Sequence, residues 1–231
     1  MKKIIIIGAG ITGLSCGIFL LKKGYDVSIY EKNDFAGGCC TGWMRNGIYI
    51  DNCIHWLTGT NQYTKTFKLW KTVGAIDETS NLYQGDYFYK SMYNGQEISL
   101  YKDLEKLRNE MLMISVEDKK EIDSFVNTVI NFTKINQDMT NFERIFKVPS
   151  YYLKSYFKYR HLSLEDLSKR FKHPLLKKLF TDFLPKEYCS LALIYAYATF
   201  ASGNGKVYSK GSKAFAENIL NKFIELGGFI H

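Results

Sequence analysis

Three glycines near the start of the chain have the spacing that a dinucleotide-binding turn needs. Gly8, Gly10 and Gly13 follow a run of isoleucines at 4–7, and an acidic residue, Glu31, lies 18 residues beyond the last of them. In such a turn the first glycine allows a tight bend, the second lets the backbone approach a pyrophosphate, and the third lets a helix pack close to the sheet. The acid, expected about 20 residues further on, holds ribose hydroxyls and repels a 2′-phosphate. NADP is therefore a poor candidate ligand.

The residues around these glycines predict the elements that position them. The isoleucine run is typical of a strand that is buried in a parallel sheet. Leu14, Ile18 and Leu21 then recur at helical spacing, and Gly24 is placed to end the helix. Residues 25–30 predict a second strand, which ends at Glu31. This order of strand, glycine turn, helix, strand and acid is the setting that the fingerprint requires, with the diphosphate at the N-terminus of the helix.

A membrane-insertion signal is the main alternative for the same stretch. Residues 4–21 carry no charge and follow Lys2 and Lys3, as in a signal peptide or a membrane span. Glycines at 8, 10, 13 and 17 interrupt the apolar run, and a strand with a correctly placed acid follows at once. We therefore prefer the dinucleotide-binding interpretation and expect a protein of the reducing cytoplasm.

The composition is that of a globular protein with a basic surface. Of 231 residues, 46% are hydrophobic and 16% aromatic, and the formal net charge is +8. A basic balance permits binding to nucleic acid or to an anionic membrane. We find no nucleic-acid-binding motif and expect no nucleic-acid partner. The five cysteines lack C-x-x-C or metal-ligand spacing, which argues against a disulfide framework and a metal site; they are Cys16, Cys39, Cys40, Cys53 and Cys189.

A second glycine pair and an Asp/His stretch follow the expected second strand. Gly37 and Gly38 lie six residues beyond Glu31, and a short expected strand at 47–51 leads into the stretch from Asp51 to His55. With the fingerprint at the N-terminus, these motifs resemble the phytoene desaturase and amine oxidase superfamily of flavoproteins, above all its phytoene desaturase and carotenoid isomerase branch. The resemblance covers the whole chain but only about the N-terminal half of a full member. It implies an α/β fold, in which an incomplete Rossmann-like FAD-binding domain of the GR2 type carries an inserted α+β substrate domain.

The same resemblance implies FAD as the cofactor, with no metal. His55 is the candidate catalytic residue, either holding substrate or relaying a proton, and a structural histidine remains the alternative. The family often has Arg or Lys where this chain has Cys39, a charge that Arg45 could supply, and it has glycine where this chain has Cys53. The implied cofactor-binding set has the fingerprint at the diphosphate, Glu31 at the adenosine ribose and the glycine pair near the flavin: Gly8, Gly10, Ile11, Thr12, Gly13, Glu31, Lys32, Gly37, Gly38, Cys39, Arg45 and His55.

The rest of the chain predicts a second domain and a return to the first. Residues 62–73 predict a helix, Asn94-Gly95 predicts a hairpin turn, and residues 103–200 are mainly helical, with S-x-x-D starts at Ser115 and Ser163. A loop at 203–212, a helix at 213–226 and a strand that starts at Phe229 resemble the family's return segment. We expect that last strand to lie beyond the second strand, with the isoleucine run on its other side. The expected domains are 1–75 (FAD-binding), 76–202 (substrate) and 203–231 (return segment).

These motifs lead to two function hypotheses. The first is a FAD-dependent oxidoreductase that desaturates or isomerises an apolar substrate such as a polyene, with a slot lined by Tyr195, Tyr197 and Phe200; a plain core is the alternative for these three. The second is a non-enzymatic half of a split flavoprotein, which needs a C-terminal-half polypeptide or a homo-oligomer. Aromatic and basic residues at 147–179 suit a helix on the inner face of a membrane, and a solvated face is the alternative.

Overall fold

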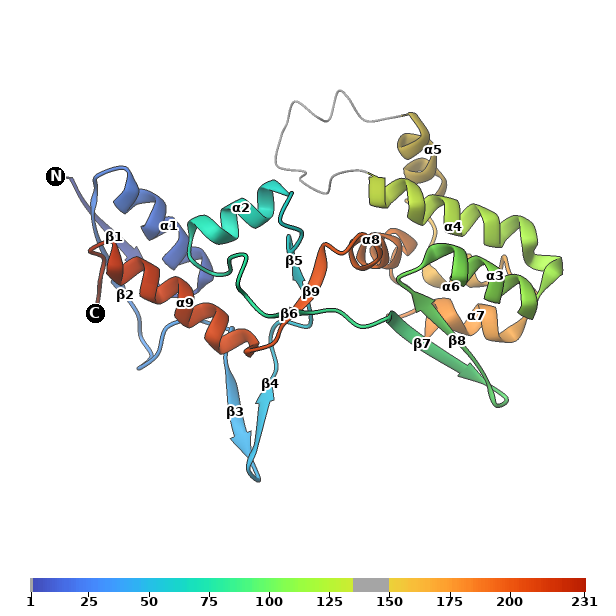
Figure 1. Ribbon diagram of the computed structural model, residues 1–231, viewed down its shortest axis with the longest axis horizontal. Coiled ribbons are helices and arrows are strands. Elements are labelled where there is room, and N and C mark those ends of the chain that lie inside the picture. Colours follow the sequence, from blue (N-terminus) through green and yellow to red (C-terminus); the bar gives the residue numbers. More distant parts are fainter. Residues whose placement is uncertain (1, 135–149) are drawn as a thin grey trace. The chain divides into compact units, whose positions relative to one another are not determined.

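The computed structural model describes residues 2–134 and 150–231, which divide into two compact units (Figure 1). Unit 1 contains Met1–Tyr83 and Lys206–His231, and unit 2 contains Gln84–Gly205. The chain therefore leaves unit 1 once and returns to it, so both of its ends lie in the same unit.

Unit 1 contains a parallel sheet of three strands in the order β1-β2-β10. The isoleucines of β1 pair in register with β2, so that Ile4 lies opposite Val27 and Ile6 opposite Ile29. The last strand pairs with the other edge of β2, where Phe229 lies opposite Ser28. This order confirms the expectation from the sequence. The elements are β1 (Lys3–Ile7), α1 (Ile11–Lys22), β2 (Asp26–Tyr30), α9 (Gly211–Glu225) and β10 (Phe229–Ile230).

The two faces of this sheet differ in burial. On one face α1 packs against α9, and the approach is so close that a Cβ on Gly17 would lie 2.6 Å from the Phe223 ring. Leu14, Ile18, Val27 and Ile29 are fully buried in the resulting core. The opposite face is exposed and apolar, with exposed fractions of 64% for Ile5, 82% for Ile7, 44% for Tyr30 and 61% for Phe229.

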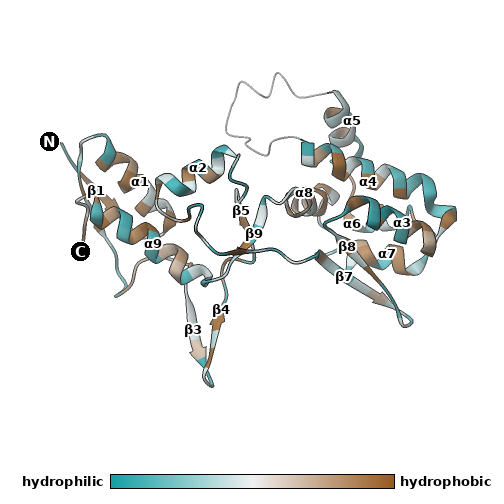
Figure 2. Ribbon diagram, viewed as in Figure 1, coloured by the Kyte–Doolittle hydropathy of each residue, from teal (hydrophilic) through white to brown (hydrophobic). Residues whose placement is uncertain are grey.

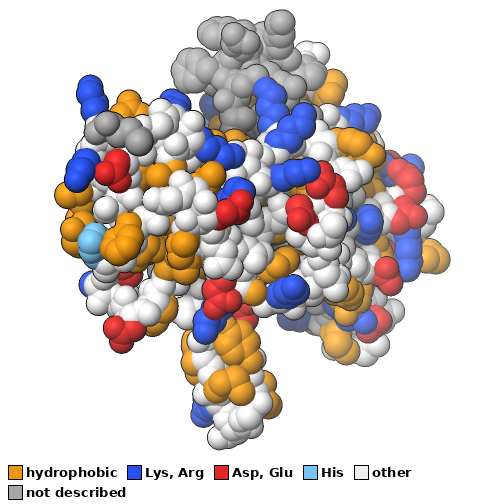
Figure 3. Space-filling view, turned by 60° about the vertical axis from the view of Figure 1, so that its left-hand side comes forward, with side chains coloured by type: hydrophobic (Ala, Val, Ile, Leu, Met, Phe, Trp, Pro, Cys, Tyr) orange, Lys and Arg blue, Asp and Glu red, His pale blue; other side chains and the backbone are white. Residues whose placement is uncertain are grey.

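Unit 1 also holds a hairpin and a small second sheet. The hairpin has exposed hydrophobic side chains at Trp43, Met44 and Ile48, and Figure 3 shows it projecting from the surface. The sequence predicts a glycine-rich loop at the start of this hairpin, but residues 42–45 form a strand because they pair with residues 48–51. In the second sheet β9 lies between β5 and β6. The elements are β3 (Gly42–Arg45), β4 (Ile48–Asp51), β5 (Leu57–Thr58), α2 (Lys65–Thr72), β6 (Leu82–Tyr83) and β9 (Gly205–Tyr208).

Unit 2 is a helical domain with one hairpin. The hairpin turns at Asn94 and Gly95, both with positive φ, as the Asn-Gly pair predicts. The helices carry hydrophobic and hydrophilic residues on different sides (Figure 2), and the hydrophobic ones meet in a core around Phe125, Phe180 and Tyr197. The elements are β7 (Tyr87–Tyr93), β8 (Gln96–Tyr101), α3 (Leu104–Ile114), the 3₁₀ helix Val116–Asp118, α4 (Lys119–Lys134), α5 (Ser150–Tyr159), α6 (Leu164–Ser168), α7 (Pro174–Thr181) and α8 (Ser190–Ala201).

The two expected helix starts in unit 2 have different outcomes. At Ser163 the capping box with Asp166 forms, as predicted. At Ser115 a helical segment also begins, as the 3₁₀ helix that leads into α4, but no side-chain cap forms. The Asp118 carboxylate accepts instead from the backbone N–H groups of Lys172 and His173 at 2.8 and 3.1 Å. Of the stretch 147–179, residues 147–149 lie outside the described residues. No described helix is long and apolar enough to cross a membrane.

Candidate dinucleotide-binding site

The glycine turn between β1 and α1 is shaped as an open cradle. Gly8 has φ +96°, which favours glycine, and a Cβ on Gly13 would collide with the Gly8 carbonyl oxygen. At Gly10 the nearest atom to such a Cβ, the Gly38 Cα, is 3.9 Å away, so space is open there. Gly10 is the N-cap of α1 and supplies no side-chain cap, so no side chain caps the N-terminus of this helix, where an anion is favoured.

Glu31 lies at the end of β2, beside this turn. Its Oε2 accepts from the Ala9 N–H at 2.7 Å, and its Oε1 accepts from the Asn33 N–H at 3.1 Å and the Asn33 side-chain amide at 2.8 Å. The Ala9 hydrogen bond, followed by those of Asn33, lowers the pKa of the Glu31 carboxyl. An ionised carboxylate has about four acceptor positions, so Glu31 can still accept from a ribose hydroxyl.

The second glycine pair lies directly against the first turn. The Gly37 N–H donates to the Ala9 carbonyl at 2.8 Å, and Gly10 and Gly37 form a parallel bridge. A Cβ on Gly38 would lie 3.2 Å from the Gly10 Cα. Both Gly37 and Gly38 have positive φ. The structure thus brings the two glycine motifs, which are 24 or more residues apart in the sequence, into one backbone-lined site.

Asp51 and Ser212 form a second link, which sequence reasoning did not predict. Ser212 donates its hydroxyl to Asp51 Oδ1 at 2.6 Å and its N–H to Oδ2, while the Ile54 N–H donates to the Ser212 Oγ at 2.8 Å. Burial raises the pKa of Asp51, but the hydrogen bonds from Ser212 and Cys53 outweigh it, so the pKa is lowered. This network joins the Asp/His stretch to the start of α9.

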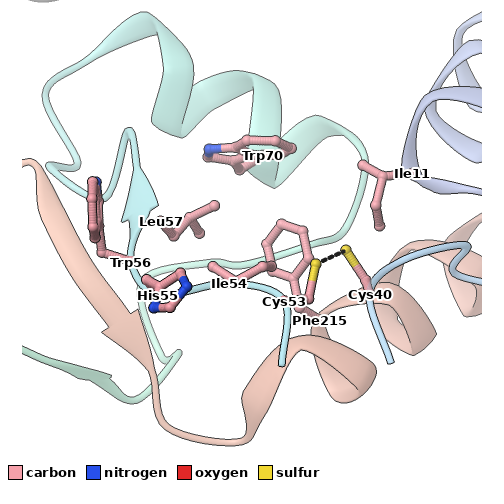
Figure 4. Close-up of a pocket in the computed structure, with 9 residues that line it drawn as sticks. All are labelled: Ile11, Cys40, Cys53, Ile54, His55, Trp56, Leu57, Trp70 and Phe215. Atoms are coloured by element: carbon pink, nitrogen blue, oxygen red, sulfur yellow. Dashed lines mark hydrogen bonds between the residues drawn. The ribbon is translucent and has the colours of Figure 1, made fainter. Parts of the chain in front are cut away.

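A cavity of about 390 Å³ opens beside the cradle (Figure 4). Its lining is mostly apolar and includes both Ile11, the first residue of α1, and the exposed His55. Trp70 closes one side: its indole N–H donates to the Thr58 carbonyl at 2.9 Å, and its ring meets the Phe215 ring edge-on at 5.4 Å. The full lining is Ile11, Cys40, Cys53, Ile54, His55, Trp56, Leu57, Trp70 and Phe215.

The remaining candidate residues differ in how near they lie to this cradle. Lys32 and Cys39 are exposed neighbours of Glu31 and Gly38. Arg45 lies at the far end of β3, about 10 Å of strand beyond Gly42, beside the hairpin turn. In unit 2 Tyr197 is buried, and its hydroxyl donates to the Tyr101 carbonyl. Tyr197 and Phe200 are members of the unit 2 core, which agrees with the alternative that they are ordinary core residues.

The donor groups present suit a flavin or nicotinamide dinucleotide. The open space at Gly10, the uncapped N-terminus of α1 and the ionised Glu31 are the features that a diphosphate and a ribose require. Among residues 2–134 and 150–231, no group of three or more His, Cys, Asp or Glu side chains could hold a metal ion.

Sequence comparisons agree with this geometry. The NAD(P)-binding Rossmann-like domain family matches residues 6–73. A 4,4'-diaponeurosporene oxygenase of Staphylococcus aureus is 25% identical over 244 residues, which cover 100% of this chain and 48% of the relative. The same enzyme of Staphylococcus haemolyticus is 32% identical over 130 residues, or 54% of this chain and 25% of the relative. This chain spans about half the length, or less, of these curated relatives.

Solved structures show the same fold. An oxidoreductase from Methanosarcina mazei matches with a TM-score of 0.52 and 17% identity, covering 100% of this chain and 51% of that one. Putrescine oxidase bound to putrescine matches with a TM-score of 0.54 and 13% identity, covering 99% of this chain and 50% of that one. The chain therefore has a Rossmann-like domain over residues 6–73, shares the fold of these oxidoreductases and is similar over its whole length to about half of a diaponeurosporene oxygenase.

Proposed function

We propose that this chain binds FAD and forms the cofactor-binding half of an oxidoreductase that acts on an apolar, polyene-like substrate. The observation that carries the proposal is the double glycine cradle, in which Gly10 and Gly37 are bridged beside an ionised Glu31. The similarity to a diaponeurosporene oxygenase supports an apolar substrate. Desaturation and isomerisation remain the two candidate reactions.

In this proposal the residues of the chain bind and orient the cofactor. The first N–H groups of α1 hold the diphosphate, Glu31 accepts from the adenosine ribose, and Gly37 and Gly38 let the backbone approach the flavin side. Bound FAD would supply the two-electron redox chemistry. The apolar cavity beside Ile11 offers a non-polar lining to the substrate, and His55 at its edge holds substrate or moves a proton at an imidazole nitrogen.

The second candidate function is that of a non-enzymatic subunit, and the exposed sheet face favours it. Parallel sheets are normally covered on both faces, yet Ile5 and Ile7 are exposed. We propose that a polypeptide equivalent to the second half of the relatives covers this face and adds a strand beside β1. In that case the chain binds dinucleotide but turns over no substrate until the second half is present.

For α5 we propose contact with an anionic lipid surface. This helix exposes Tyr151, Leu153 and Phe157 together with Lys154 and Lys158, a combination of apolar and basic side chains that suits a membrane interface. Co-sedimentation with vesicles that contain phosphatidylserine should decrease as salt rises. Equal binding to neutral and to anionic vesicles would contradict the proposal that the basic residues of α5 contribute to membrane binding.

The cofactor is tested by equilibrium dialysis of the purified chain against FAD, NAD and NADP. We expect retention of FAD, which Glu31→Gln weakens about ten- to a hundred-fold through a lost hydrogen bond to an ionised group. Gly10→Val should abolish retention, since its side chain fills the open space, with an unchanged circular dichroism spectrum. Asp34→Asn, at an exposed acid three residues after Glu31, is the matched control for the loss of one negative charge. Preference for NAD over FAD would overturn the proposal.

The reaction is tested separately, with the chain and a polypeptide equivalent to the second half of its relatives. For desaturation we expect anaerobic bleaching of the flavin by an apolar polyene and not by a diamine, whereas isomerisation would change the absorption of the polyene without net bleaching. Bleaching by the chain alone would exclude the subunit hypothesis. Bleaching by the diamine alone would move the substrate class to amines and leave the FAD proposal intact.

A further inference from the structure

Cys40 and Cys53 lie opposite each other just beyond the base of the β3–β4 hairpin. The register ends with Gly42 opposite Asp51, and Cys40 and Cys53 each lie two residues beyond this last pair. Their Sγ atoms are 3.7 Å apart, and Figure 4 shows the two sulfurs facing each other in the wall of the cavity. Both are free thiols in this structure. The contact brings together two cysteines whose sequence spacing matches no redox motif.

The end of the hairpin next to the two cysteines has a spacing that is compatible with a disulfide. Directly opposed residues of an antiparallel pair have Cα atoms about 4.5–5.5 Å apart. That separation falls inside the range of about 4.4–6.8 Å that disulfides span. The last pair of the hairpin lies two residues from each cysteine, and the contact between the sulfurs shows that the two segments are still close at Cys40 and Cys53.

The two cysteines are hydrogen-bonded to different segments, Cys40 to the dinucleotide cradle and Cys53 to Asp51. The Cys40 N–H donates to the Gly37 carbonyl at 3.1 Å, and the Gly37 N–H donates to Ala9 in the first glycine turn. On the other side the Cys53 N–H donates to Asp51 Oδ1 at 3.2 Å. A bond between the sulfurs would therefore fasten the loop of the second glycine pair to the Asp51 segment.

We propose that Cys40 and Cys53 form a reversible disulfide by exchange with a low-molecular-weight disulfide such as oxidised glutathione, and that this bond fixes the wall of the dinucleotide cradle. The proposal concerns the two thiols of this chain and does not depend on which dinucleotide binds. The pair lines the open cavity beside the cradle, so a small disulfide can reach it.

The exchange proceeds in two balanced steps. Burial, followed by the contact with Cys53, raises the pKa of Cys40 to about 12, and Cys53 is the more accessible of the two, so Cys53 loses its proton to solvent and attacks first. It attacks the small disulfide, forms a mixed disulfide and releases one small thiolate. Cys40 loses its proton to solvent and attacks the Cys53 sulfur, which releases the second thiolate. Two protein thiols are oxidised, and one small disulfide is reduced to two thiols.

The test is to equilibrate the purified chain in buffers of graded oxidised-to-reduced glutathione ratio, block free thiols by alkylation and map tryptic peptides without reduction. We expect a crosslink between the peptides 33–45 and 46–65, which reverses as the ratio falls. The first peptide also contains Cys39, so the crosslink must persist in Cys39→Ser and vanish in Cys40→Ser. A crosslink that needs Cys39, or thiols at 40 and 53 that stay fully alkylated at the most oxidising ratio, would overturn the proposal.

Thermal unfolding gives a second readout on the same samples. A disulfide that closes a loop of this length should raise the Tm of the oxidised chain by about 5–10 °C. Cys53→Ser should show no difference between oxidised and reduced buffer. Since Cys16 and Cys189 are exposed free thiols, Cys16→Ser and Cys189→Ser serve as controls that keep the shift. If oxidation raised the Tm of Cys53→Ser as much as that of the parent chain, the increase would come from another thiol and the proposal would be wrong.

Discussion

The two units bury their hydrophobic residues in different ways. Unit 2 surrounds its core, so that Phe125 and Tyr197 are fully buried by residues of the same unit. Unit 1 covers one face of its sheet with α1 and α9 and leaves Ile5 and Ile7 of the other face exposed. The same unit carries the open cradle at Gly10. We infer that unit 2 supplies stability by itself, whereas unit 1 depends on something bound to it.

The largest expected effect is in the unit 2 core. Phe125→Ala removes a buried ring that meets Phe180 edge-on at 4.9 Å, and it should cost about 3–5 kcal/mol of unfolding free energy. Denaturant unfolding with hydrogen exchange of the unit 2 amides measures it. Met113→Ala, an exposed apolar residue of the same unit, should cost less than about 0.5 kcal/mol. An equal loss of unfolding free energy in the two variants would contradict the prediction that the core of unit 2, and not its surface, determines its stability.

A smaller effect is expected in the glycine turn, where two glycines provide a matched pair. Gly13→Ala should destabilise unit 1 by about 1–3 kcal/mol, because its Cβ collides with the Gly8 carbonyl. Gly10→Ala has room for a Cβ and should leave stability unchanged while it weakens dinucleotide binding. Thermal unfolding and dialysis are measured on both. Equal loss of stability in the two variants would mean that Gly10 serves packing rather than binding.

The exposed sheet face should affect association more than folding. We expect the isolated chain to self-associate as its concentration rises, because an apolar face with an open edge strand seeks a partner. The double variant Ile5→Lys and Ile7→Lys should reduce association, with a change in unfolding free energy within about 0.5 kcal/mol for each exposed site. Sedimentation velocity measures the effect. A monomeric parent chain at all concentrations would show that this face needs no cover.

The smallest expected effect is the pH dependence from Asp51. Its pKa is lower in the folded chain than the ordinary value of 3.8, so its contribution is complete above that value and is lost as pH falls through the lowered folded pKa. Below pH 3.8, the unfolding free energy of unit 1 should therefore fall more steeply in the parent chain than in the Asp51→Asn variant. Ser212→Ala removes the hydroxyl donor to Asp51 but keeps the N–H donor, so it should reduce the pH dependence of stability only in part. Identical acid unfolding of parent and Asp51→Asn would rule out this link.

The sequence predicts the local part of this fold well. Strand β1, the glycine turn, α1 and β2 follow one another within 31 residues, so spacing and hydrophobic period are sufficient. Strand β3 was missed because Gly42 and its neighbours have no alternation of their own; the strand forms through pairing with β4. The Asp51–Ser212 link joins residues 161 apart, and the Cys40–Cys53 contact depends on a hairpin register. Neither is visible in a local pattern.

The positions of the tryptophans have a practical consequence for the comparison of the two units. The chain has three, at 43, 56 and 70, and all lie in unit 1, where Trp56 and Trp70 line the cavity. Intrinsic tryptophan fluorescence therefore reports on unit 1 alone, without any label. Loss of emission on dinucleotide binding would follow the filling of the cavity, and an emission change that precedes the loss of helical ellipticity would show that unit 1 unfolds before unit 2.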